Sequence, residues 1–358
     1  MKGISGRRKS AYTGWVPYIC AMMSSGKVIV TGGAGYIGSH TVVDLQRAGY
    51  EVVVLDNLSN SDIRVLDGIA AITGTRPRFH RMDIQDEGRL REVMTEHRDA
   101  WGVIHFAAFK AVGESVQRPL DYYANNVGGM ISLLRVMAGL EMDRVIFSSS
   151  CTVYGQPAVL PVTEDAPVQV AQSPYGNTKQ ICEEILRDAV SAGSFNGVIS
   201  LRYFNPVGAD PSALIGELPL GVPANLMPFI TQTAAGLREE LKVYGGDYAT
   251  PDGTAIRDYI HVSDLAAAHR VALERLVRGK QQEAFEIFNI GTGRGTSVLE
   301  VIQAFEKVSG RTLPYRIVDR RPGDVEQVWA DTTRANRVLG WTAERSLEDM
   351  VASAWKWE

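Results

Sequence analysis

The sequence predicts an α/β protein with a doubly wound parallel (Rossmann) sheet and a smaller C-terminal mixed α/β domain. Short apolar runs rich in β-branched residues alternate with helical stretches as far as residue 205, which is typical of a parallel sheet. A glycine-rich turn joins the first run to the first helical stretch. Beyond residue 205 proline and glycine become frequent and the alternation ends. We therefore expect one domain over 26–205 and a second over 206–358, with a cleft between them.

Six apolar runs are the main expected strands of the first domain. They read KVIVTGG (27–33), EVVVLDN (51–57), WGVIHFAA (101–108), DRVIFSSS (143–150), GVISLRYFN (197–205) and, much later, EIFNIGTG (286–293). The last run follows a strong helical pattern over 262–277, for which Ser263 is the expected N-cap. We expect this later segment, near 260–292, to return to the first sheet.

Composition excludes several classes of protein. The 358 residues are 45% hydrophobic and 22% charged, as in a globular protein with a sizeable core. The net charge is -4, whereas a nucleic-acid-binding domain is usually basic. No run of about 18 apolar residues is present, so no membrane span is expected. Cys20, Cys151 and Cys182 lack metal-ligand spacing and cannot all pair, which favours reduced thiols in the cytoplasm and no metal site.

The first 25 residues differ from the rest of the chain. They begin with basic residues and become mildly apolar, but Tyr12, Gly14 and Pro17 interrupt the apolar stretch that a signal peptide needs. We expect residues 1–25 to be a disordered extension, or the product of an upstream start codon with the native start at Met22 or Met23.

The segment TGGAGYIG indicates a dinucleotide site. Gly35 and Gly38 combine with Gly33 as GxGxxG and with Gly32 as GxxGxxG. Glycines allow a tight turn and a close approach of the backbone to a pyrophosphate, and the following helix directs its N-terminus at the phosphates. The motif lies directly between an expected strand and an expected helix, which distinguishes it from a plain tight turn.

Acidic residues at the next strand ends indicate which dinucleotide binds. Asp56 ends the second strand, 18 residues after Gly38, where a carboxylate accepts hydrogen bonds from ribose hydroxyls and repels a 2'-phosphate. This favours NAD over NADP. Asp83, in the segment MDI, follows a further expected strand and could reach the adenine, although a simple turn residue is the alternative.

The segment SPYGNTK (173–179) has the spacing of an acid–base pair. Ser173 and Pro174 are favoured at a helix start, so Tyr175 and Lys179 lie one turn apart on one face. A free tyrosine has a pKa near 10, and a nearby lysine cation stabilises its phenolate. Such a pair is common on helix surfaces, but behind a dinucleotide motif it indicates proton transfer with a hydroxyl.

A serine cluster closes the strand DRVIFSSS. The carboxyl ends of strands in such a sheet face the ligand crevice, so these hydroxyls can contact a substrate or the tyrosine. We expect Ser150 to be the catalytic hydroxyl because it begins the loop, whereas capping of loose backbone groups is the alternative.

Together these motifs resemble the extended short-chain dehydrogenases/reductases, and within them the UDP-glucose 4-epimerase family. The matching segments include VTGGAGYIGSH, LDNLSNS, VIHFAAFKAVGESV, YYANNVGG, FSSSCTVYG, SPYGNTK, RYFNPVGA, NLMPFI, DGTAIRDYIHVSDLA and RRPGD. They run in order from about Lys27 to the end, and residues 1–25 lie outside the resemblance. The resemblance implies a tightly held NAD, a UDP-sugar substrate bound by the second domain, and a homodimer.

The resemblance also implies a mechanism and further contacts. UDP-glucose and UDP-galactose would interconvert through a 4-keto sugar, with Tyr175 as base, Lys179 as its electrostatic partner and Ser150 as hydrogen-bonding hydroxyl. The implied cofactor contacts are Gly32, Gly35, Tyr36, Ile37, Gly38, Asp56, Asn57, Asn60, Ser61, Asp83, Ile84, Phe106, Lys110, Asn125, Tyr175, Lys179 and Tyr203. The implied substrate contacts are Ser150, Tyr175, Phe204, Asn205, Asn225, Leu226, Tyr244, Arg257, Arg321, Asp324 and Val328.

Two positions depart from relatives in an informative way. Cys151 and Thr152 follow Ser150, where related dehydratases place an Asp-Glu pair, and this argues against dehydration. Val328 stands where several epimerases restricted to UDP-glucose and UDP-galactose carry tyrosine, so UDP-GlcNAc and UDP-GalNAc are further candidate substrates, unless Val328 is a packing valine. The alternatives are an epimerase for UDP-xylose and UDP-arabinose, and a non-catalytic NAD-binding sensor.

Overall fold

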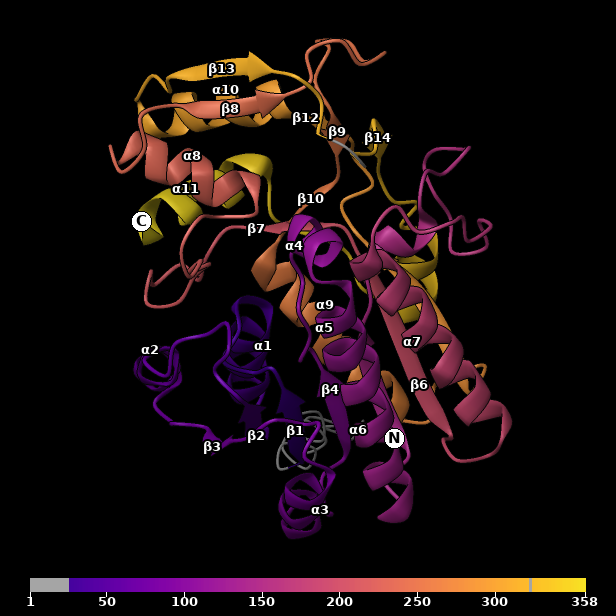
Figure 1. The fold of residues 1–358 in the computed structure, drawn as a ribbon. Coiled ribbons are helices and arrows are strands. Elements are labelled where there is room, and N and C mark those ends of the chain that lie inside the picture. Colours follow the sequence, from indigo (N-terminus) through magenta and orange to yellow (C-terminus); the bar gives the residue numbers. More distant parts are fainter. Residues whose placement is uncertain (1–25, 322–323) are drawn as a thin grey trace, which may run out of the picture.

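The computed structural model describes residues 26–321 and 324–358, and the extension expected over 1–25 lies outside the described residues. Its main element is a seven-stranded parallel sheet in the order β11-β6-β5-β4-β1-β2-β3 (Figure 1). The strands are β1 (Lys27–Thr31), β2 (Glu51–Asp56), β3 (Arg78–Arg81), β4 (Gly102–His105), β5 (Arg144–Ser148), β6 (Gly197–Tyr203) and β11 (Phe285–Ile290). The doubly wound parallel sheet predicted from the sequence is confirmed.

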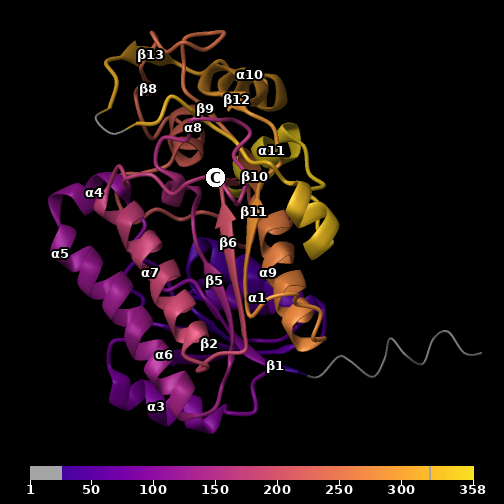
Figure 2. The same ribbon diagram turned by 90° about the vertical axis from the view of Figure 1, so that its right-hand side faces the viewer.

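Helices cover both faces of this sheet (Figure 2). One face carries α1 (Tyr36–Arg47), α2 (Val65–Thr73), α9 (Val262–Val277) and the π-helical turn η3 (Ala335–Leu339). The other face carries α3 (Glu87–Glu96), α6 (Gly129–Gly139) and α7 (Pro174–Ser191). The short elements α4 (Val112–Gln117), α5 (Pro119–Tyr122) and η1 (Tyr123–Gly128) lead into α6, and η2 (Cys151–Tyr154) follows β5.

Two apolar layers hold these helices to the sheet. Strand residues alternate between the faces: Val28 and Val30 contribute to the layer under α1 and α9, whereas Ile29 contributes to the layer under α6 and α7. All three side chains are fully buried. The sheet is therefore covered on both sides, as a parallel sheet requires, and only its strand ends are free to build a site.

A second lobe lies over the carboxyl ends of the strands (Figure 1). It contains the strand pairs β7 (Asn205–Val207) with β10 (Tyr259–His261) and β8 (Leu241–Tyr244) with β13 (Tyr315–Val318), and the small sheet β12 (Thr296–Ser297), β9 (Ile256–Arg257) and β14 (Gln327–Val328). Its helices are α8 (Leu226–Ala234), α10 (Val298–Ser309) and α11 (Leu347–Trp357), which share an apolar core. Mixed strand directions distinguish this lobe from the first.

The chain returns to the first sheet after entering the second lobe. Strand β11 pairs in parallel with β6, and α9 packs beside α1. The helix α9 does not use Ser263 as its N-cap, so that expectation is wrong. His261, the last residue of β10, is the cap, and its Nδ1 accepts the N–H of Ser263 at 3.0 Å. The strand runs directly into the helix, which leaves the side chain at the strand end in the capping position.

The described helices offer no membrane span. In residues 26–321 and 324–358, none of them combines the length with the apolar character that crossing a bilayer requires.

Candidate active site

A large cleft runs between the two lobes, and both contribute to its walls. Its volume is about 2260 Å³, well above the roughly 300–1,000 Å³ of a site for one small ligand. Its floor is formed at the carboxyl ends of the strands, where the order reverses between β1 and β4. Crevices of this type bind nucleotides in open α/β sheets.

The glycine turn forms one end of the cleft. Gly32 has φ +70°, a conformation that glycine adopts without strain. A Cβ on Gly38 would lie 2.2 Å from the carbonyl oxygen of Gly32, so only glycine allows the turn to pack this closely against α1. The helix begins at Tyr36 with no side-chain cap at Gly35. Its first N–H groups are therefore directed toward the cleft without a competing side chain, which suits an anionic group.

Asp56 organises the loops beside the glycine turn. Its Oδ2 accepts the N–H of Ala34 at 3.0 Å, and its Oδ1 accepts the N–H of Leu58 at 2.8 Å and the hydroxyl of Ser61 at 3.0 Å. Each carboxylate oxygen accepts about two hydrogen bonds, so Oδ2 retains acceptor capacity toward the cleft. Asp56 thus has a structural task in addition to the ribose contact that the sequence predicts.

The start of α7 is built as the sequence predicts. Ser173 is the N-cap, its hydroxyl accepts the N–H of Gly176 at 3.1 Å, and Pro174 takes the first helical position. Tyr175 and Lys179 follow on one face, and only 6% and 4% of their surfaces are exposed. Both nevertheless line the cleft.

Lys179 is held by the end of β5. Its Nζ donates a hydrogen bond to the carbonyl oxygen of Ser148 at 2.8 Å. The ammonium also lies 4.9 Å from the ring centroid of Phe147 and 5.8 Å from that of Tyr175. Burial lowers the pKa of Lys179 to about 8, while the negative charge of Glu183 raises it. Lys179 is therefore still a cation at neutral pH.

The tyrosine is neutral in this arrangement. Burial raises the pKa of Tyr175 well above 10, and a hydrogen bond from the Ser150 side chain acts in the opposite direction. Tyr203, the last residue of β6, has a pKa raised to about 12, again mainly by burial, and its ring hydroxyl lies 3.0 Å from the Ser148 hydroxyl. Burial thus disfavours the phenolate form of Tyr175, and a positive charge close to the ring oxygen is needed to offset this effect.

Two predicted site residues lie behind the cleft wall. Ser150 does not line the cleft: its hydroxyl accepts the N–H of Thr152 at 3.2 Å and caps η2. Ser150 thus caps backbone groups, which is the alternative that the sequence left open, and its side chain also lowers the pKa of Tyr175. Phe204 is also absent from the lining and packs with Tyr154 and Val328 in a small apolar cluster.

All the other predicted contact residues line the cleft. On the cofactor side these are Gly32, Gly35, Tyr36, Ile37, Gly38, Asp56, Asn57, Asn60, Ser61, Asp83, Ile84, Phe106, Lys110, Asn125, Tyr175, Lys179 and Tyr203. On the substrate side they are Asn205, Asn225, Leu226, Tyr244, Arg257, Arg321, Asp324 and Val328. Asn57 and Asp83 are joined by a hydrogen bond of 3.0 Å, which brings two strand ends together.

Cations and acids of the second lobe cluster near Val328. Pairing of β9 with β14 sets Arg257 opposite Val328. Arg257 Nη2 lies 3.6 Å from Asp324 Oδ1, and Arg321 Nε donates to Asp324 Oδ2 at 3.2 Å. The Arg321 guanidinium also lies 4.8 Å from the ring centroid of Tyr244. The single carboxylate of Asp324 pairs with both arginines, so these three side chains together carry a net positive charge, which suits a diphosphate.

Sequence reasoning missed Glu217. Its carboxylate accepts from Lys110 at 3.1 Å and from the Asn225 amide at 2.6 Å, so it connects the two walls of the cleft. No motif marks it, because its partners lie 107 residues before it and eight residues after it.

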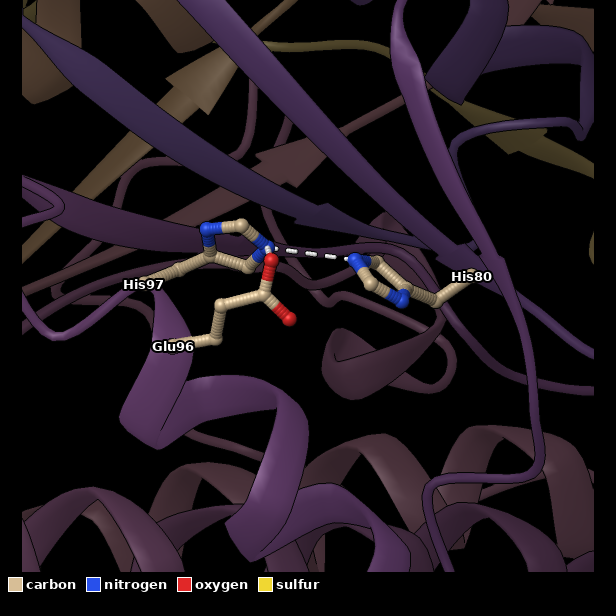
Figure 3. A group of neighbouring side chains, drawn as sticks. All are labelled: His80, Glu96 and His97. Carbon is tan, nitrogen blue, oxygen red and sulfur yellow. Dashed lines mark hydrogen bonds and ion pairs between the residues drawn. The ribbon is translucent and has the colours of Figure 1, made fainter.

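Figure 3 shows a separate pair of neighbouring histidines, His80 and His97. They lie on β3, an edge strand of the sheet, and at the end of α3, and neither lines the cleft. His80 Nε2 and His97 Nε2 are 3.1 Å apart, with Glu96 beside them. Coordination through Nε2 would place a proton on Nδ1 of His97, which is buried and has no partner within residues 26–321 and 324–358, whereas metal-bound histidines normally donate that proton. Arg78 already pairs with Glu96 at 3.1 Å. The donor set favours a hydrogen-bonded pair of neutral imidazoles over a metal site.

Comparison with known proteins places this geometry in a family. A family model described as GDP-mannose 4,6 dehydratase matches residues 29–354. UDP-glucose 4-epimerase of Bacillus subtilis (strain 168) is 51% identical over 331 residues, which are 92% of this chain and 96% of that protein. The chain belongs to the UDP-glucose 4-epimerase family.

Solved structures of UDP-glucose 4-epimerases agree with this family. One, from Stenotrophomonas maltophila with bound NAD and formylated UDP-arabinopyranose, has a TM-score of 0.89 and 50% identity, covering 93% of this chain and 97% of that one. Another, from Bifidobacterium longum in complex with NAD+ and UDP, has a TM-score of 0.88 and 46% identity, covering 92% and 97%. The likeness spans both lobes, so the resemblance seen in the sequence motifs is confirmed over the described chain.

Proposed function

We propose that this protein is an NAD-dependent isomerase that interconverts UDP-glucose and UDP-galactose by oxidation and re-reduction at the sugar C4, through a 4-keto sugar. The observation that carries the proposal is the buried Tyr175–Lys179 pair, which lines the same cleft as the glycine turn. The family membership and its relatives at about half identity support the same reaction.

The residues beside the glycine turn fit NAD. The turn leaves no room for a Cβ at Gly38, α1 presents free N–H groups, and Asp56 has acceptor capacity for a ribose hydroxyl. The negative charge of Asp56 opposes a 2'-phosphate, which favours NAD over NADP. The chemistry that NAD supplies when bound is hydride acceptance and return at its nicotinamide, together with a positive charge.

The chain's own residues move the proton. The Tyr175 oxygen, as phenolate, takes the proton of the sugar 4-hydroxyl and later returns it to the reduced sugar. Lys179 stabilises the phenolate because its ammonium is fixed by the Ser148 carbonyl and remains charged near neutral pH. The Ser150 side chain lowers the pKa of Tyr175 from behind the cleft wall and so favours the phenolate.

The second lobe holds the nucleotide end of the substrate. Arg257 and Arg321, with Asn225 and Leu226 on the neighbouring wall, would bind the UDP portion. Binding energy is then concentrated on the part of the substrate that does not react, which leaves the sugar free to turn over between the two hydride transfers.

A direct assay tests the proposal. The purified protein is incubated with UDP-galactose in the absence of added NAD, and the formation of UDP-glucose is followed. It is then denatured and the supernatant is assayed for released NAD. Activity together with released NAD supports the proposal, whereas released NAD without any epimerisation would identify a non-catalytic binding protein.

The family model's description raises dehydration as the competing reaction. Dehydration needs a proton donor after Ser150, and the residues there are Cys151 and Thr152. Burial raises the pKa of Cys151 to about 12, so its thiol is a poor acid at neutral pH. This favours epimerisation.

The region around Val328 supports a broader substrate range. Val328 is buried, lines the cleft and contacts a cluster of apolar side chains. Because valine is much smaller than tyrosine, we propose that the cleft also accepts the N-acetyl group of UDP-GlcNAc and UDP-GalNAc. Turnover of both substrate pairs is compared in wild type and Val328→Tyr. The proposal requires that wild type converts the acetylated pair and that the variant loses this activity selectively.

A cytoplasmic homodimer is also part of the proposal, on the ground of the family resemblance. Light scattering during gel filtration measures the mass of the particle, and a mass of one chain at micromolar concentration would contradict the dimer. Fractionation of cells that express the tagged protein tests the location.

A further inference from the structure

A buried hydrogen-bond network lies directly behind the strand end that faces the acid–base pair. Its centre is Glu183 on α7, which is 3% exposed. Oε1 of Glu183 accepts the hydroxyls of Ser149 at 2.6 Å and Ser200 at 2.8 Å. Arg202 of β6 donates to both carboxylate oxygens, from Nη2 at 2.6 Å and from Nε at 3.0 Å. These four side chains lie outside the cleft lining, so none can act on a ligand directly.

The network belongs to a row of contacts in which successive turns of α7 face successive residues at the end of β5. Tyr175, Lys179 and Glu183 are spaced by four residues, so they lie on one face of α7, about 6 Å apart along its axis. Residues 148–150 face them. The Ser148 carbonyl oxygen accepts from Lys179, and the Ser149 hydroxyl donates to Glu183. The Ser150 side chain follows them and lowers the pKa of Tyr175.

We propose that Ser149 and Glu183 are positioning residues, whose hydrogen bond holds the end of β5 at the distance from α7 that proton transfer requires. This inference rests on the proposed epimerase function, because it assigns a task to a strand end that holds Lys179, the electrostatic partner of the proposed base. Ser149 directly follows Ser148, whose carbonyl oxygen accepts from Lys179, so a shift of Ser149 displaces that contact.

The other partners of Glu183 explain why it can serve as a fixed point. Arg202 grips the carboxylate through its fork of donors, which sets the orientation of both oxygens. Ser200 lies inside β6 and is already held by ladder pairing, in register with Phe147 of β5 and Ile287 of β11. Ser149 instead follows the last residue of β5, and its N–H donates to the Leu201 carbonyl oxygen of β6 at 3.0 Å. That backbone bond ties Ser149 to β6 but not to α7, so its side-chain bond to Glu183 is the contact that sets the distance between this strand end and α7.

This contrast provides a matched pair of variants. Ser149→Ala and Ser200→Ala each remove one fully buried hydroxyl that donates to the same oxygen. We expect similar losses of thermal stability from both. Ser149→Ala should lower kcat about 10- to 100-fold, the size of effect that a misplacement of about 1 Å produces, with little change in the KM for UDP-galactose or in NAD content. Ser200→Ala should keep the kcat of wild type.

The outcomes separate this inference from the proposed function. A wild-type protein without epimerase activity would defeat the proposed function itself. An active wild type in which both serine variants have equal kcat, whether unchanged or equally reduced, would defeat only the positioning role.

A second pair of variants tests the role of Glu183 without changing Ser149, through the pH profile of kcat. Lys179 faces Tyr175, Cys182 and Glu183 on its own helix and His105 on β4, and of these only Glu183 is charged near neutral pH. Arg202 on β6 is the other nearby charge, paired with Glu183.

Glu183→Gln removes the negative charge that raises the pKa of Lys179, so the alkaline limb of kcat should move to lower pH. The control is Glu286→Gln, which breaks the buried pair with Arg275 at the edge of the sheet. That control should lose stability without moving the alkaline limb. Equal profiles in both folded variants, measured on the NAD-containing fraction, would overturn the role of Glu183.

Discussion

The two walls of the cleft are constructed in opposite ways. On the wall formed by the first lobe, Tyr175 and Lys179 are almost fully buried, and Lys179 and the strand end behind it have their hydrogen bonds satisfied within the protein. On the wall formed by the second lobe, Tyr244 is 38% exposed and Arg321 is also exposed. Their acidic partner Asp324 is shared with Arg257. Donors on this wall are therefore available to a ligand.

This difference matches two demands of the proposed reaction. Proton transfer needs atoms whose positions are set before the substrate binds, which buried and fully bonded groups provide. Recognition of a diphosphate needs forked donors that can be desolvated by the ligand itself, and partly exposed arginines provide these. Separation of the two tasks allows the sugar to rotate against a rigid wall while the nucleotide remains held.

The largest effect on kcat is expected from removing the reacting oxygen of Tyr175 on the rigid wall. Tyr175→Phe removes the proton acceptor and should lower kcat by about 10²- to 10⁴-fold, the usual contribution of a general base. Steady-state turnover of UDP-galactose measures the loss, and NAD released after denaturation serves as the control for an intact cleft. Unchanged turnover would refute the proposed mechanism.

The next effect concerns the stability of the same wall. Glu183→Gln leaves the Arg202 charge buried without its partner, and loss of one partner of a buried pair costs about 3–5 kcal/mol of the free energy of unfolding. Urea denaturation followed by tryptophan fluorescence measures it. The exposed pair of Arg78 and Glu96 supplies the contrast, since Glu96→Gln should cost no more than about 1 kcal/mol. Similar losses in both variants would contradict the comparison of buried with exposed charges.

A smaller effect is expected on the recognition wall. Arg257→Ala should raise the KM for UDP-galactose about 10- to 100-fold, because a hydrogen bond to a charged group contributes about 1.5–3 kcal/mol. We expect kcat to change little, since Arg257 does not contact the acid–base pair. Inhibition by UDP alone should weaken in parallel. A fall in kcat with unchanged KM would show that the two walls do not divide the work in this way.

The smallest effect is a dependence on pH. Burial lowers the pKa of Lys179 to about 8, so the lysine is charged below that pH and loses its charge as the pH rises through it. Its stabilisation of the Tyr175 phenolate is then lost, and kcat should fall on the alkaline side. A profile of kcat at saturating substrate, with NAD content checked at each pH, measures this. Constant kcat up to pH 10 would contradict it.

Local features of the site were predictable from the sequence because they depend on neighbours along the chain. The glycine turn before α1 and the cap formed by Ser173 were recognised from spacing alone, and both occur as expected. The cap at His261 was missed because that residue is a strand end that becomes a cap only when the strand continues directly into α9. Glu217 was missed because its partners come from distant segments.

The strand–turn–helix units and the placement of Tyr175 and Lys179 on one face follow from the amino-acid order alone, since helix periodicity and turn chemistry act over a few residues. Contacts between distant segments instead place Ser150 behind the cleft wall, bond Glu183 to Ser149, and set Arg257 beside Val328. These contacts join residues that are up to 71 positions apart, and packing of the sheet against α7 and of β9 against β14 brings them together. The same packing buries Lys179 and lowers its pKa to about 8, which neighbours along the chain do not reveal.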